Sequence, residues 1–168
     1  MLPAITRVLF IVFGAIASVT FFSVPYFNRL EAVKNKAEVK INDQIIIAEV
    51  AHDEESRNLG LSGREKLNIN EGMLFIFEDP GIYPFWMKDM KFPIDIIWID
   101  SDNRIADIDA NVQPEPGVPE EGLMQYKPPI PVERVLELRA GRAQLLSAEV
   151  GDLIKARPLV NSQKLKGL

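Results

Sequence analysis

One short stretch of the sequence holds the side chains best suited to binding a small molecule. Trp86 offers an aromatic face, Lys88 a cation and Asp95 a carboxylate, all within ten residues. An aromatic ring beside charged groups is typical of sites that bind a sugar or another small ligand. We therefore predict a ligand site formed by Trp86, Lys88 and Asp95, with Arg64 as a further member. The alternative is that Trp86 and Trp98 only fill the ends of a β-barrel core.

Asp95 is the most informative of these residues because of the strand around it. It lies in the segment 94–99 (IDIIWI), which is apolar on both alternating faces. A carboxylate on such a strand must be paired or protonated, since an unpaired buried charge costs several kcal/mol. Arg64 is the first predicted partner and Lys88 the second. Asp95 is then either a ligand-binding or acid–base carboxylate, or one half of a structural ion pair.

No complete set of catalytic or metal-binding residues is present. The chain has no cysteine and one histidine, His52, which excludes thiolate sites and sites with several histidines. The segment 60–63 (GLSG) is one residue short of a nucleophile elbow. Asp107, Asp109 and Asn111 are spaced like calcium-loop ligands, but the glycine that such a loop needs is missing. We predict no metal and no cofactor, and we favour a protein that is not an enzyme.

The composition describes a folded domain with an appendage. Of 168 residues, 47% are hydrophobic and 26% are charged, which suffices for a sizeable core. Nineteen lysines and arginines stand against twenty-four acidic residues, for a net charge of −5. A general nucleic-acid-binding protein would show a basic excess, so we predict no nucleic-acid partner.

The N-terminal end differs from the rest of the chain. Residues 8–27 contain no charged side chain, and twenty helical residues span about 30 Å, the thickness of a bilayer core. We predict that residues 1–27 are a membrane anchor, with a cleaved signal sequence as the alternative. Residues 28–40 would be a juxtamembrane linker and 158–168 a flexible tail. We favour a single-pass protein with its folded domain outside the cytoplasm, although the positive charges after the apolar run favour the opposite orientation.

The body, residues 41–157, has the alternation and turn signals of a mainly β domain. Asp53 and Gly60 bracket a short capped helix. Asp79-Pro80-Gly81 has the composition of a turn, and the proline-rich segment 113–131 that of a long loop. A second helix is predicted over 142–149. Strands are predicted over 38–41, 44–51, 73–77, 94–99, 104–109, 132–138 and 153–156. The predicted fold is a compact jelly-roll-like sandwich or barrel with one or two short helices, preceded by a transmembrane helix.

Three segments carry a resemblance to a known family. Gly72–Asp100 (GMLFIFEDPGIYPFWMKDMKFPIDIIWID) resembles the signature of domain of unknown function 192. Arg57–Leu67 (RNLGLSGREKL) and Arg134–Asp152, which contains RVLELRAGRAQ and VGD, are similar to its flanking motifs. The family usually has Asn-Thr after the lysine of the signature, where this chain has Asp89-Met90. The resemblance implies a mostly β, jelly-roll-like fold, often exported or membrane-tethered, and implies no reaction.

Three functions remain open at this stage. The first is a membrane-tethered domain that binds a small molecule or a glycan. The second is a structural or partner-binding envelope protein that uses the loop 113–131 as a contact. The third is a hydrolase or lyase that depends on carboxylates. A cavity that holds Asp95 with an arginine or lysine would favour the first and third, and a filled barrel with an exposed apolar loop would favour the second.

Overall fold

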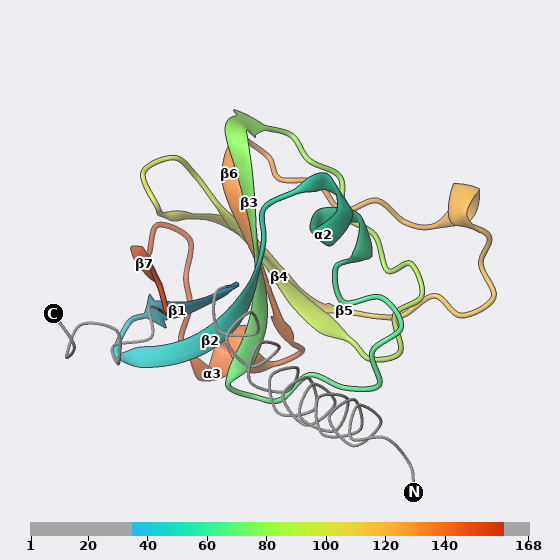
Figure 1. The fold of residues 1–168 in the computed structure, drawn as a ribbon, viewed down its shortest axis with the longest axis horizontal. Helices are drawn as coiled ribbons and strands as arrows, with labels where there is room; N and C mark the ends of the chain where they lie inside the picture. The colour runs from blue at the N-terminus through green and yellow to red at the C-terminus, as the bar shows by residue number, and fades with distance from the viewer. Residues whose placement is uncertain (1–34, 160–168) are drawn as a thin grey trace, which may run out of the picture. The chain divides into compact units, whose positions relative to one another are not determined.

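A computed structural model describes residues 35–159 (Figure 1), and the predicted membrane segment, residues 8–27, lies outside them. Within residues 35–159, no helix is long and apolar enough to cross a membrane. The elements, in chain order, are β1 (Lys36–Ile41), β2 (Gln44–Ala51), α2 (Glu54–Leu59), β3 (Glu71–Gly81), β4 (Ile94–Ile99), β5 (Ile105–Val112), the 3-10 helix η1 (Glu120–Gly122), β6 (Val132–Arg139), α3 (Arg142–Leu145) and β7 (Ile154–Pro158).

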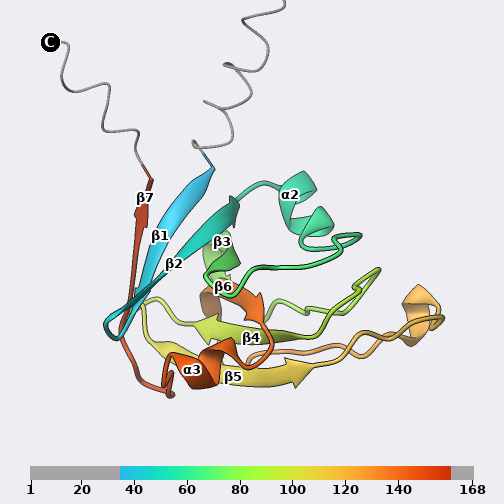
Figure 2. The same cartoon turned by 90° about the horizontal axis from the view of Figure 1, so that it is seen from below.

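The strands form one seven-stranded sheet in the order β5-β4-β6-β3-β2-β1-β7. Among these strands, only the neighbours β2 and β3 are parallel. Parallel neighbours need a long crossover connection, and α2 lies within this one. The sheet is strongly bent, so that β1, β2 and β7 stand steeply to β4 and β5 (Figure 2). A bridge between Arg104 and Leu153 joins the two outer strands at one end. The prediction of a mainly β domain with one or two short helices is confirmed, with α2 and α3 as the two.

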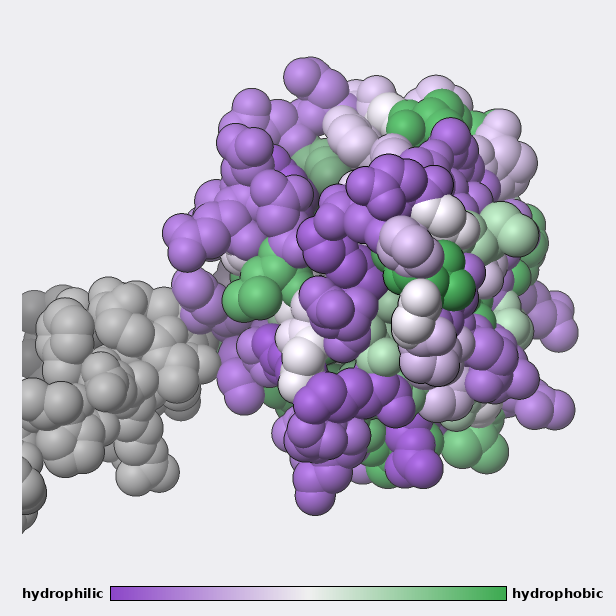
Figure 3. All heavy atoms as spheres, turned by 90° about the vertical axis from the view of Figure 1, so that its right-hand side faces the viewer, coloured by the Kyte–Doolittle hydropathy of each residue, from purple (hydrophilic) through white to green (hydrophobic). Residues whose placement is uncertain are grey.

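The sheet has an apolar cluster on each face because successive side chains of a strand point to opposite sides. All six residues of β4 are buried, as its two-sided apolar pattern predicts. We call the two clusters core A and core B. Core A contains Val39, Ile41, Ile46, Leu74, Ile97, Ile99, Leu136 and Leu138, among others. Core B contains Leu61, Met73, Phe75, Met87, Ile94, Ile96, Trp98, Val132 and Val135, among others. On the side of the molecule shown in Figure 3, hydrophobic residues form small separate patches among hydrophilic ones.

Three details differ from the predictions. Strand β1 begins at Lys36, inside the predicted linker 28–40, because Ala37 and Val39 are buried in core A. Asp79-Pro80-Gly81 is not a turn but the end of β3. The pairing of β3 with β6 is interrupted between Ile76 and Gly81, so the missing N–H of the proline breaks no ladder bond there. Helix α3 covers only the first four residues of the segment 142–149.

The short helix α2 forms where the capping residues predicted it. The Asp53 carboxylate accepts a hydrogen bond from the Ser56 backbone N–H (2.7 Å), and the Ser56 hydroxyl completes a capping box. Gly60 ends the helix with a φ of 50°, a conformation that disfavours a side chain. A Cβ atom on Gly60 would lie 3.4 Å from the Phe75 ring. This close approach places the end of α2 directly against the aromatic residues described next.

Candidate functional site

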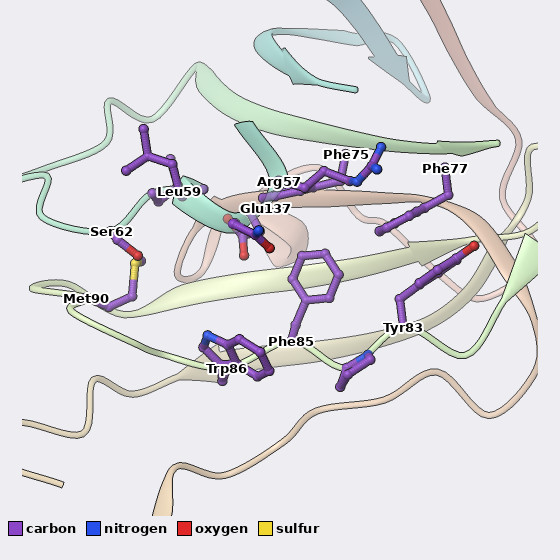
Figure 4. Close-up of a pocket in the computed structure, with 14 residues that line it drawn as sticks. Arg57, Leu59, Ser62, Phe75, Phe77, Tyr83, Phe85, Trp86, Met90 and Glu137 are labelled. Atoms are coloured by element: carbon purple, nitrogen blue, oxygen red, sulfur yellow. The ribbon is translucent and has the colours of Figure 1, made fainter. Parts of the chain in front are cut away.

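A cavity of about 170 Å³ lies on the core B side of the sheet. Figure 4 shows Tyr83, Phe85 and Trp86 along one side, with Phe75, Phe77 and Glu137 opposite and the Phe85 ring pointing between them. Residues of α2 and the turn after it also contribute to the lining. The complete lining is Arg57, Asn58, Leu59, Gly60, Leu61, Ser62, Phe75, Phe77, Tyr83, Pro84, Phe85, Trp86, Met90 and Glu137.

The aromatic walls are held by contacts among their rings. Phe85 meets Phe75 edge to face, with ring centroids 4.9 Å apart, and meets Trp98 of core B in the same way at 5.4 Å. Phe77 stacks on Tyr83, with centroids 3.6 Å apart. Edge-to-face and stacked pairs stabilise a fixed ring geometry beyond simple burial. The cavity therefore has aromatic walls that the core itself positions.

Trp86 lies at the mouth of the cavity, 41% exposed. Its backbone is held because Phe85 and Tyr126 exchange two hydrogen bonds (2.9 and 2.8 Å), which tie this segment to the proline-rich loop 113–131. On the other side, the Ser62 hydroxyl donates to the Lys88 carbonyl (2.9 Å), and the Gly63 N–H donates to the Asp89 carbonyl (3.0 Å). These bonds fasten the turn after α2 to the chain that follows Trp86.

Glu137 is the acidic group of the cavity. It lies on β6 between Met73 of β3 and Ile96 of β4, and it is only 6% exposed. Its Oε2 is shut off from solvent and has no hydrogen-bond partner within residues 35–159. Burial raises the pKa of Glu137 to about 8, an effect that the nearby Arg64 guanidinium only partly opposes. A carboxyl group with this pKa can hold or release a proton near neutral pH.

Arg64 is paired with a different carboxylate. Its guanidinium donates to both oxygens of Glu49, with Nη1 to Oε1 at 2.6 Å and Nη2 to Oε2 at 2.9 Å. These two hydrogen bonds hold the pKa of Glu49 below its ordinary value. Arg64 therefore acts on Glu137 through its charge, while its donors are directed at Glu49.

Asp95 lies on the opposite face of the sheet from the cavity. It is fully buried, and its carboxylate accepts hydrogen bonds from the backbone N–H groups of Asn111 (2.8 Å), Gly141 (3.2 Å) and Ala143 (2.8 Å). The predicted ion pair with Arg64 or Lys88 is wrong. Backbone donors at a shift in the β4–β5 register and at the start of α3 satisfy the carboxylate instead.

The structure does not bring the four predicted ligand-binding residues together. Only Trp86 lines the cavity. Lys88 is ion-paired with Glu120 and lines a second hollow of about 160 Å³ between its own turn and the loop 113–131. Arg64 lies near Glu137, and Asp95 is on the far face. Within residues 35–159, no group of three or more His, Asp or Glu side chains is placed to hold a metal ion.

Five residues of the cavity were not predicted as site residues from the sequence: Glu137, Phe75, Phe77, Tyr83 and Phe85. Glu137 interrupts the apolar residues of RVLEL, and this is the one local signal that a buried acid is present. The aromatic residues were hidden among ordinary core positions. Their grouping depends on the pairing of β3 with β6 and on the return of the chain through 83–86.

Two solved structures of other proteins share the fold of this domain. A protein of unknown function from Novosphingobium aromaticivorans has 28% identity and a TM-score of 0.61, covering 71% of this chain and 83% of its own. A protein from Sinorhizobium meliloti, described as a proposed transcription regulator, has 28% identity and a TM-score of 0.62, covering 72% of this chain and 92% of its own. No curated protein matches the sequence. The model of the family DUF192, described as an uncharacterized ACR, matches residues 37–156, and the chain therefore belongs to this family.

Proposed function

We propose that this DUF192 domain binds a small molecule in the aromatic cavity beside Glu137 and Trp86, while residues 8–27 tether it to a membrane. The observation that carries the proposal is the Glu137 carboxyl group, buried without a hydrogen-bond partner for Oε2 at the wall of a cavity. Buried polar groups in folded proteins are almost always paired. Within residues 35–159 only Glu137 Oε2 and Arg142 Nε are buried without a partner, and of these two residues only Glu137 lines the cavity, where a ligand would pair with its carboxyl group.

The size of the cavity suits a small ligand. Protein interiors are close-packed, and an apolar cavity of roughly 150 Å³ is large enough to bind benzene. At about 170 Å³, this cavity takes a group of similar size, with more room at the mouth beside the exposed Trp86. A glycan would have to enter by one terminal group.

Partner binding through the loop 113–131 would use its exposed apolar residues, Val118, Met124 and Ile130. On the side shown in Figure 3, hydrophobic residues lie in small separate patches rather than in a broad apolar face. The proline-rich loop 113–131 also has an internal role, because Tyr126 pairs with Phe85 behind the cavity. A loop used in this way holds the aromatic segment in place.

A hydrolase or lyase is the second candidate function, and one observation favours it. The raised pKa of Glu137, about 8, is a property of general acids that work at neutral pH. Glu137 would then take the role for which the sequence suggested Asp95. Catalysis would require turnover of a compound that binds in the cavity, and Glu137→Gln would abolish it.

Ligand binding is tested by the fluorescence of Trp86. The chain has two tryptophans, so Trp98→Phe leaves Trp86 as the sole reporter. Full-length protein of this background is titrated with small amines, carboxylates, amino acids and sugars, after a cooperative melt has shown that it folds. We expect a saturable change with one class of compound, at weaker affinity in Glu137→Gln and at unchanged affinity in Lys88→Ala. Absence of a saturable change with every class would contradict the proposal.

Tethering is tested separately. The full-length protein is expected to sediment with membranes and to resist extraction by high salt. A chain that starts at residue 35, just before β1, should remain in the supernatant and melt cooperatively. Full-length, unprocessed protein in the soluble fraction would contradict the anchor.

A further inference from the structure

We infer that the ligand of the cavity is a small organic cation, whose ammonium group is enclosed by the aromatic walls and paired with the Glu137 carboxylate. This inference rests on the proposed function and adds the chemical class of the ligand. It depends on three features of the cavity: its rings, its local charge and its small number of free hydrogen-bonding groups.

The rings provide the faces that a cation requires. The face of an aromatic ring is electronegative and attracts a cation within about 6 Å, most strongly when the ring is tryptophan. Arg57 already forms a cation–π contact of this kind, with its guanidinium carbon 5.3 Å from the centroid of Phe77. Phe77 is occupied by Arg57 and by the stacked Tyr83, whereas Trp86 at the mouth is 41% exposed. A ligand cation would therefore lie between Trp86, Phe85 and Glu137.

When Glu137 is ionised, Arg64 acts on it through its charge, and no group within residues 35–159 forms a hydrogen bond with its Oε2. From β2 and the turn after α2, Glu49 and Arg64 neutralise each other in a two-point ion pair. From α2, Arg57 donates through Nη1 to the carbonyls of His52 (2.7 Å) and Ile76 (3.1 Å), which hold it at Phe77. On β3, Glu71 acts on Arg64 and adds further negative charge. A ligand cation would pair directly with Glu137, whereas Arg57 is held at Phe77 and at the two carbonyls.

The lining disfavours the other ligand classes. A sugar needs several donors and acceptors, but the Ser62 hydroxyl is already bonded to the Lys88 carbonyl. Above about pH 8, where Glu137 is ionised, an anion would be repelled by its carboxylate in a cavity where burial strengthens the repulsion. A quaternary ammonium group needs no hydrogen bond, only ring faces and a negative charge.

The test compares choline with its uncharged isostere, 3,3-dimethylbutan-1-ol, in which carbon replaces the charged nitrogen. Both are titrated into the full-length Trp98→Phe protein at constant ionic strength, in a detergent without ammonium or sugar headgroups. We expect choline to bind at least tenfold more tightly than the isostere at pH 9. Choline affinity should rise about tenfold from pH 7 to pH 9, because only ionised Glu137 pairs with it and its pKa is about 8. The isostere should show no such rise.

Two variants complete the test. Glu137→Gln should remove the preference for choline while leaving the isostere bound, and Lys88→Ala, outside the cavity, should keep the preference. Equal binding of choline and isostere, or a preference that survives Glu137→Gln, would overturn the cation inference and leave the ligand cavity in place. The same holds if only sugars or carboxylates bind with a change in Trp86 fluorescence. If no compound of any class binds, both the inference and the proposed function fail.

Discussion

Asp95 and Glu137 are buried carboxyl groups on adjacent central strands, and they face opposite sides of the same sheet. In the pairing of β4 with β6, Asp95 lies opposite Leu138 and Glu137 lies opposite Ile96. Asp95 accepts three backbone hydrogen bonds. Glu137 has no partner for Oε2 within residues 35–159. Two acids one register step apart therefore have opposite environments.

The difference separates an acid with a structural role from one to which we assign ligand binding as a proposal. The donors of Asp95 come from the β5 bulge and from the start of α3, so its carboxylate fastens two peripheral segments to core A. Among the described residues, Glu137 Oε2 has no partner of this kind, and the side chain borders a cavity instead. Burial alone identifies neither role, because both residues are almost completely covered. The hydrogen-bond partners decide which role each acid has.

The largest expected effect is the pH dependence that Glu137 imposes on stability. Its pKa is about 8 in the folded protein and 4.5 ordinarily, so between these values the folded state holds a proton that the unfolded state has released. The stabilisation is complete below about pH 4.5 and is lost as the pH rises through 8. The loss should be on the order of 4 kcal/mol. Urea denaturation at pH 5, 7 and 9 measures it.

Glu137→Gln provides the control for this measurement, because glutamine fills the same space without titrating. The variant should show a flatter profile and a higher free energy of unfolding than the parent at pH 9. Parallel profiles for the two proteins would show that Glu137 is solvated or paired, and the contrast with Asp95 would disappear.

The second largest expected effect is the loss of stability when the Asp95 carboxylate is removed. Asp95→Ala leaves the N–H groups of Asn111, Gly141 and Ala143 buried without an acceptor, and we expect a loss of about 3 kcal/mol or more. Asp95→Asn keeps one acceptor oxygen and should lose less. Urea denaturation at pH 7 compares the three proteins. A loss below about 1 kcal/mol in Asp95→Ala would mean that water replaces the carboxylate and that its role is not structural.

Local patterns in the sequence predicted the elements of the fold well. Alternation in IDIIWI correctly indicated a strand buried on both faces, because side-chain direction in a strand has a period of two. Asp53 and Gly60 correctly marked α2, because a cap depends on residues within one turn. The turn at 79–81 was predicted wrongly, since its outcome depends on the distant pairing of β3 with β6.

The site itself depends on contacts between residues that are far apart in the sequence. The donors that satisfy Asp95 at α3 lie 46 and 48 residues along the chain, and they are backbone groups that no side-chain pattern reveals. Glu137 is buried because β6 lies between β3 and β4, a strand order that no local signal specifies. The predicted partners were chosen by charge, and the observed partners are set by topology.

Substitution of Trp86 tests ligand binding with a smaller effect on stability than substitution of a buried aromatic residue of core B. Because the side chain is 41% exposed, Trp86→Ala should cost about 2 kcal/mol in the free energy of unfolding, less than the loss of a fully buried tryptophan. The same change should weaken choline binding at least tenfold, measured by calorimetry because the reporter is lost. Phe85→Leu is the matched comparison, since Phe85 contacts both Phe75 and Trp98 and should lose stability as well as binding. Unchanged choline affinity in Trp86→Ala would move the binding site away from the mouth.

The smallest expected effect is that of Lys88, the predicted site residue that the structure places outside the cavity. Its ammonium group is paired with Glu120 at the surface, where solvent and salt screen the attraction. Lys88→Ala should therefore leave the urea midpoint and the choline affinity unchanged within error, at both low and physiological ionic strength. Its backbone carbonyl, which accepts from the Ser62 hydroxyl, survives the substitution. A fall in choline affinity of more than threefold would mean that the binding site continues from Trp86 into the hollow around Lys88, and it would bring Lys88 back into the ligand site.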